Sequence, residues 1–188
     1  MRALIVPGVM CWLLELPVNR QTYFSRRIIS RWGAVVVKIA KEYLLQATDF
    51  VIEKNIVTMP DDPVEIIVIP EFQRGVTVAY LDPPGPLDKG QVAFYAVAPL
   101  PAEWTEEQIM SYLRAYNMLS IQDLTIHEGV PGHYLQLALS NRYPSSLRAV
   151  LSSGPMVEGW DVYTERIMID EVYLDHDPLM RLIIIPVH

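Results

Sequence analysis

The apolar residues of this chain follow two different spacings, one helical and one extended. Between residues 37 and 56 they recur every three or four positions, which predicts an amphipathic helix. Short apolar runs bounded by proline, glycine or charged residues follow at 64–69, 76–81 and 91–98, and such runs are typical of strands. We expect them to form a small antiparallel sheet.

The second half of the chain returns to helical spacing. Thr105, with Gln108 three residues later, has the pattern of a capping box, and the helix that it opens should run to about Asn117. Further helices are expected at residues 119–139 and 155–173. The pattern therefore predicts an α+β fold that is mostly helical, with the small sheet packed on the helices.

A cluster of ionisable residues interrupts the apolar pattern of one predicted helix. His127 and Glu128 are followed by a second imidazole at His133, and neutral imidazoles beside a carboxylate are the chemistry of a hydrolytic zinc site. On a regular helix, a spacing of six residues would turn His133 about 240° away from His127. Pro131 and Gly132 can break the helix, so we expect an irregularity there that brings the two imidazoles together.

A second cluster, later in the chain, is strongly acidic. Glu158, Asp161 and Glu165 are spaced so that a helix presents them on one face. Two histidines need a third ligand, and a set of two histidines and one glutamate, with a fourth position open, is established in catalytic zinc sites. We choose Glu158 as that ligand. Asp161 or Glu165 could accept a proton from a ligand imidazole and so fix its orientation.

With both motifs, the chain resembles the domain of unknown function 885 family, mostly bacterial helical proteins that look like zinc peptidases of the gluzincin type. The resemblance rests on His-Glu-x-x-Pro-Gly-His from His127 to His133, and on Glu-Gly-Trp-x-x-Tyr-x-Glu from Glu158 to Glu165. It implies a gluzincin-like hydrolase with Zn²⁺ as cofactor. The implied metal ligands are His127, His133 and Glu158, and the implied catalytic general base is Glu128.

Other residues match the motifs without a role that the resemblance defines. Tyr134, Tyr163 and Glu165 occupy motif positions, and together with Asp161 they are candidates for orienting a ligand or contacting substrate. The chain departs from the family near its end, because the residues before His188 lack the Asp and Gly that usually precede a late histidine. The resemblance therefore assigns no role to His188.

Family members are usually much longer, so the chain resembles a piece of one. We divide it into an N-terminal segment of unclear role at residues 1–36 and a partial metallopeptidase-like catalytic domain at 37–188, truncated at its C-terminal end. Helices that the family would place after this point would be missing. We therefore expect the apolar run at residues 182–187 to be exposed and to favour self-association.

Composition narrows the choice of partners. Apolar residues make up 51% of the 188 positions, enough for a substantial core. The net charge of −7 argues against a nucleic-acid partner, since such surfaces concentrate lysine and arginine. Cys11 is the single cysteine, so no intrachain disulfide can form. The sequence therefore does not indicate a cellular compartment, and full-length relatives could be cytoplasmic or exported. The apolar run at 3–14 is too short for a membrane span.

The leading hypothesis is a zinc-dependent metallopeptidase acting on a peptide substrate. One alternative is a metal-binding but catalytically incomplete fragment. Another is a non-enzymatic helical interaction domain, in which His127 and Glu128 belong to a hydrogen-bond network and Glu158 and Glu165 are solvated helix charges. Metal content separates the last hypothesis from the first two, and peptide hydrolysis separates those two from each other.

Overall fold

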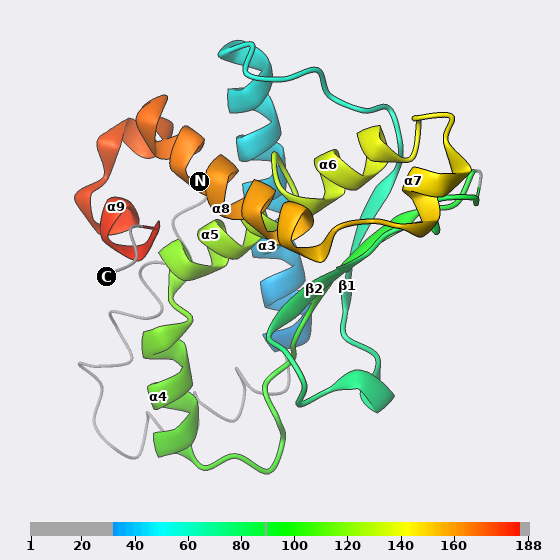
Figure 1. Cartoon of the computed structure of the whole chain (residues 1–188). Helices are drawn as coiled ribbons and strands as arrows, with labels where there is room; N and C mark the ends of the chain where they lie inside the picture. The colour runs from blue at the N-terminus through cyan, green and yellow to red at the C-terminus, as the bar shows by residue number, and fades with distance from the viewer. Residues whose placement is uncertain (1–31, 89, 185–188) are drawn as a thin grey trace.

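The computed structural model describes residues 32–88 and 90–184 (Figure 1). These residues form one small sheet packed against helices, which confirms the predicted α+β, mostly helical class. In chain order the elements are α3 (Trp32–Glu53), β1 (Val64–Val68), η1 (Glu71–Gln73), β2 (Ala79–Asp82), β3 (Ala93–Val97), α4 (Glu106–Ala115), α5 (Met118–Glu128), α6 (His133–Ser140), α7 (Ser146–Val150), α8 (Gly154–Asp170), η2 (Tyr173–His176) and α9 (Pro178–Ile184).

The sheet is mixed, and the prediction of an antiparallel sheet is wrong for one of its two strand pairs. The strand order is β1-β3-β2: β3 pairs antiparallel with β2 but parallel with β1. The apolar runs carry no information on strand direction. The connection between β1 and β2 carries the chain past the middle of the sheet. β3 then fills the middle position, where it pairs with β1 on one side and β2 on the other. β1 and β2 form the two edges of this sheet.

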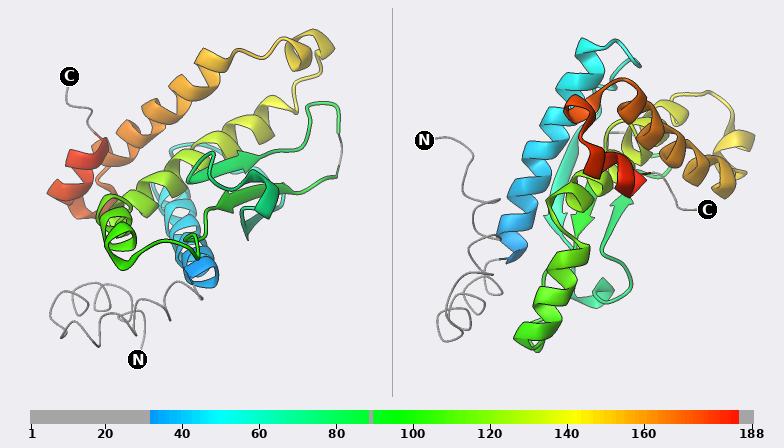
Figure 2. Two further views of the ribbon diagram at one scale, coloured as in Figure 1. Left: turned by 90° about the horizontal axis from the view of Figure 1, so that it is seen from below. Right: turned by 90° about the vertical axis from the view of Figure 1, so that its left-hand side faces the viewer.

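The core has two parts, and α5 contributes to both. In the first, Val36 and Ile39 of α3 pack with Ile66 of β1 and Tyr95 of β3. In the second, Ile126 of α5 is buried with residues from the other end of α3 and from α6, α8 and α9. Figure 2 shows the resulting order, with α5 between α3 on one side and α8 on the other. This burial holds the end of α5, which carries the first histidine, in a fixed frame.

The local helix signals are confirmed in several places. Thr105 caps α4 and makes the reciprocal capping box with Gln108. The last predicted helix corresponds to α8, which begins one residue earlier and ends three residues earlier than expected. The pattern did not predict η1, α7, η2 or α9. Within the described residues, no helix is both long and apolar enough to cross a membrane.

Some sequence predictions fall on residues that the structure does not describe. The segment at 1–36 is described only from Trp32 onward, and the apolar run at 182–187 only as far as Ile184. The run at 3–14 and His188 lie outside the described residues. The division of the chain at residue 36 therefore stays a prediction.

Candidate metal centre

The chain turns sharply between α5 and α6, as the proline and glycine of the motif predict. α5 ends at Glu128, α6 begins at His133, and the Val130–Pro131 peptide bond between them is cis. Gly132 donates its backbone N–H to the carbonyl of Ile126 over 3.0 Å. A Cβ atom on Gly132 would lie 1.8 Å from the carbonyl oxygen of His127, so only glycine can pass this close to α5.

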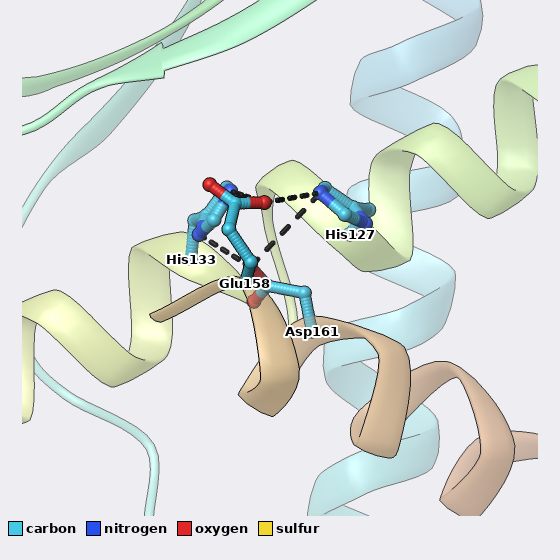
Figure 3. Close-up of side chains that lie close together, drawn as sticks. All are labelled: His127, His133, Glu158 and Asp161. Atoms are coloured by element: carbon cyan, nitrogen blue, oxygen red, sulfur yellow. Dashed lines mark ion pairs between the residues drawn. The ribbon is translucent and has the colours of Figure 1, made fainter. Parts of the chain in front are cut away.

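This turn brings the two imidazoles together. The ring centroids of His127 and His133 are 4.9 Å apart and their planes are nearly perpendicular. Glu158 and Asp161 reach the same place from α8, as Figure 3 shows. One potential ligand atom from each of these four residues lies within 4.8 Å of the other three.

The spacing of the potential ligand atoms fits a single metal ion. The Nε2 atoms of His127 and His133 each lie 3.9 Å from the same carboxylate oxygen, Oε2 of Glu158. Atoms bound to one tetrahedral zinc ion at about 2.1 Å are about 3.4 Å apart. Small rotations of the side chains would close the difference, and the exposed Glu158 side chain has room to make them.

The other nitrogen of each imidazole is held by a second carboxylate of α8. Nδ1 of His127 lies 2.7 Å from Oε1 of Glu165, and Nδ1 of His133 lies 2.5 Å from Oδ2 of Asp161. Such contacts fix the tautomer and leave Nε2 free as a metal ligand. The sequence left open whether Asp161 or Glu165 would orient an imidazole, and the structure places one on each.

Asp161 gives a second reason to expect a cation. Its side chain is fully buried, and among residues 32–88 and 90–184 neither of its oxygens has a hydrogen-bond donor in good geometry, although Oδ2 lies 2.5 Å from Nδ1 of His133. A buried carboxylate is costly unless positive charge or hydrogen bonds compensate it. A divalent ion beside His127 and His133 would provide that compensation.

Both imidazoles have a pKa above that of a free histidine. The hydrogen bond to Glu165 raises the pKa of His127 to about 9, against the effect of burial. Burial acts to lower the pKa of His133, but the hydrogen bond and the charge of Asp161 raise it on balance. At neutral pH a metal ion would therefore have to displace the proton of His127, and its uptake should depend on pH.

Glu128 lies next to the cluster but outside it. Its side chain is buried and its charge interacts with those of both histidines, while the backbone N–H of Leu81 on β2 donates a hydrogen bond to it. Burial is the main reason that its pKa is raised. A buried carboxylate that is oriented by a backbone donor and lies beside a metal centre is suited to proton transfer.

Comparisons with known proteins identify the family of this chain. Residues 20–185 match the family model described as a bacterial protein of unknown function, DUF885. The chain belongs to the DUF885 family. No curated protein matches it.

A solved structure has the same fold as this DUF885 chain. It is the crystal structure described as "the putative lipoprotein from Colwellia psychrerythraea", with a TM-score of 0.56 and 20% sequence identity. The match covers 94% of this chain and 33% of that one. The likeness shows a shared fold, and the DUF885 chain spans about a third of the length of this relative.

Two candidate residues of the DUF885 chain do not point to the cluster. Tyr134 is buried in α6, and its hydroxyl donates a hydrogen bond to the backbone carbonyl of Asp62. Tyr163 is 58% exposed on α8. The first therefore anchors α6 to the loop before β1, and the second faces solvent in the described part of the chain.

Sequence reasoning missed two residues around the cluster. Asp123, one turn before His127 on α5, has its pKa raised to about 7 by burial and by the charge of Glu165. Its spacing of four residues from His127 was a signal that it shares that face. Trp160, the tryptophan of the second motif, donates its indole N–H to the carbonyl of Pro131 over 2.9 Å.

Proposed function

We propose that this chain carries the catalytic centre of a zinc-dependent peptidase. His127, His133 and Glu158 would hold the ion, and Glu128 would act as the general base. The proposal rests above all on one observation: both Nε2 atoms face one carboxylate oxygen at 3.9 Å while both Nδ1 atoms contact buried or nearly buried carboxylates. A zinc ion bound there would supply a Lewis acid that polarises a carbonyl and activates water.

Glu128 is the residue best placed to move the proton. In peptide hydrolysis the oxygen of water forms a bond to the carbonyl carbon, the C–N bond breaks, and a proton from the water ends on the leaving nitrogen. Glu128 would take that proton and deliver it to the amine. Its raised pKa makes it a better base than an exposed glutamate, and the N–H of Leu81 keeps its carboxylate oriented.

The position of the edge strand β2 supports a peptide as substrate. Ala98 donates its N–H to the carbonyl of Val78, so the register places the backbone groups of Ala79 and Leu81 on the side of β2 that faces away from β3. The N–H of Leu81 on this edge is the group that reaches Glu128. The carbonyl of Ala79 on the same edge accepts a hydrogen bond from the Thr77 hydroxyl. An extended peptide that lies along this edge would pass beside the base, and it would have to replace these two contacts to pair with β2 as a further strand.

The proposal is tested by two substitutions that separate binding from chemistry. Glu128→Gln should keep bound zinc and lower hydrolysis of a peptide library by about 10² to 10⁴. His133→Ala should lose zinc and hydrolysis together, because it removes a ligand. Zinc content by atomic emission and turnover at matched zinc occupancy measure the two effects.

Three outcomes would change the proposal. Equal loss of zinc in both variants would make Glu128 a ligand and not the base. Zinc uptake without turnover by the wild-type chain would favour the metal-binding but catalytically incomplete alternative. No zinc uptake at all would favour the non-enzymatic helical domain.

A further inference from the structure

The indole of Trp160 connects α8 to the turn that aims His133. Its Nε1–H donates to the carbonyl oxygen of Pro131 over 2.9 Å, and the indole is half-buried. Pro131 lies in the middle of the turn, between the end of α5 and the start of α6. The contact therefore joins two parts of the chain that each supply ligand atoms to the candidate metal centre.

The carbonyl of Pro131 depends on this donor. The first amides of α6 use the carbonyls on either side of it: Leu135 bonds to Gly129 over 3.5 Å and Gln136 bonds to Gly132 over 3.0 Å. Pro131 itself is buried. A buried carbonyl without a donor costs free energy, so removing the indole N–H should loosen the turn at this residue.

Trp160 stands next to the residues that form the centre. Glu158 is two positions earlier, and Asp161, which contacts the imidazole of His133, is the next residue. One turn of α8 thus supplies three groups. Trp160 bonds to the backbone before His133, Asp161 contacts the Nδ1 atom of His133, and Glu158 is the proposed carboxylate ligand. The position of His133 relative to Glu158 depends on all three contacts.

We propose that Trp160 is a positioning residue of the metal centre: its hydrogen bond to Pro131 locks the turn onto α8 and so sets the distance between His133 and Glu158 before metal binds. The inference rests on the proposed function only as far as metal binding. It requires no peptide hydrolysis. It gives the tryptophan of the Glu-Gly-Trp motif a role separate from packing.

Trp160→Phe removes the donor and keeps an aromatic ring. Zinc affinity of the full chain, measured by competition with a chromophoric chelator, should fall by about tenfold or more, which is the usual effect of losing a group that orients a ligand. Trp104→Phe is the matched control. Trp104 is also half-buried, but it packs against Tyr112 of α4, so its replacement should leave zinc affinity unchanged.

Two further readouts separate positioning from general loss of stability. Urea unfolding with chelator present gives the stability of the metal-free protein, and the absorption spectrum with Co²⁺ reports the coordination geometry. We expect an altered Co²⁺ spectrum only in Trp160→Phe, with its metal-free stability lowered no more than that of Trp104→Phe. If phenylalanine prevents folding, a benzothienyl side chain at position 160 keeps the indole shape without the N–H, and it must show the same loss.

Unchanged zinc affinity and an unchanged Co²⁺ spectrum in Trp160→Phe would overturn the inference, while zinc binding by the wild type would leave the proposed function standing. An equal loss of affinity in the Trp104 control would also overturn it, since the effect would then follow stability. A wild-type chain that binds no zinc would overturn both proposals. Peptide hydrolysis is not needed to decide among these outcomes.

Discussion

The two histidines of the candidate centre are held in different ways. His127 belongs to the last turn of α5, a regular helix that is buried between α3 and α8. His133 is the first residue of α6, and its direction is set by the turn before it, which contacts α5 through Gly132 and α8 through Trp160. One ligand is thus placed by local helical structure, and the other by contacts between distant parts of the chain.

The two sides also differ in burial. Side-chain exposure is 25% for His127 and 12% for its partner Glu165, against 12% for His133 and 0% for its partner Asp161. Polar groups depend more on their hydrogen bonds where water cannot replace them. Substitutions on the side of His133 should therefore have larger effects than equivalent substitutions on the side of His127.

The largest effect should come from Gly132→Ala. A Cβ atom at this position would lie 1.8 Å from the carbonyl oxygen of His127, so α5 and the turn must separate. We expect the free energy of unfolding in urea to fall by more than about 3 kcal/mol, and zinc binding to be lost with it.

Gly159→Ala on α8 is the matched control. No atom outside its own helix neighbourhood lies within 4 Å of a Cβ built there, and alanine favours a helix over glycine by about 1 kcal/mol. This variant should be as stable as the wild type or more so, and should bind zinc normally. A Gly132→Ala protein with wild-type stability would mean that the turn is not tightly packed against α5.

The same contrast explains what could be predicted from the sequence. Helical spacing places His127, and the acidic face of Glu158, Asp161 and Glu165 follows from their positions on one helix. The six-residue spacing from His127 required a break in the helix before His133, and Pro131 and Gly132 were the residues that could make it. The geometry of this break depends on the hydrogen bond from Trp160 and on the close contact between Gly132 and α5. The spacing of residues along the chain predicts neither contact.

The sequence also could not predict which carboxylate contacts which histidine. Asp161 and Glu165 share a helix face, so spacing alone could not say which imidazole each would meet. The distance between α5, α6 and α8 decides it, and that distance is a property of the core. The parallel direction of β1 and β3 could not be predicted either, because it depends on how the chain between these strands crosses the sheet.

A direct test of the difference in burial compares the two carboxylates. Asp161→Asn and Glu165→Gln each replace the acceptor of an imidazole Nδ1 proton by an amide of the same shape. Such changes cost about 10- to 100-fold in metal affinity, and we expect Asp161→Asn at the upper end and Glu165→Gln at the lower. Zinc titration by calorimetry at one pH measures both. The reverse order would show that burial does not control the strength of these contacts.

The smallest expected effect is a dependence of stability on pH that arises mainly at His127. Its pKa in the folded, metal-free protein is raised to about 9, mainly by the hydrogen bond to Glu165, whereas an unfolded histidine titrates near about 6.5. A raised pKa means that the folded state holds the proton more tightly. The stabilisation is therefore complete below about pH 6.5 and is lost as the pH rises through about 9.

Urea unfolding with chelator between pH 7 and 9.5 should show this loss in the wild type. We expect it to be on the order of 1 kcal/mol, because water reaches part of the pair and screens it. Glu165→Gln should flatten the curve, since it removes the group that raises the pKa of His127. Asp123, with a pKa of about 7, is half protonated at pH 7 and adds to the loss of stability up to about pH 8, so the part of the curve above pH 8 reports the histidine. An unchanged slope in Glu165→Gln would place the titrating group elsewhere, and His133 beside Asp161 would be the next residue to test.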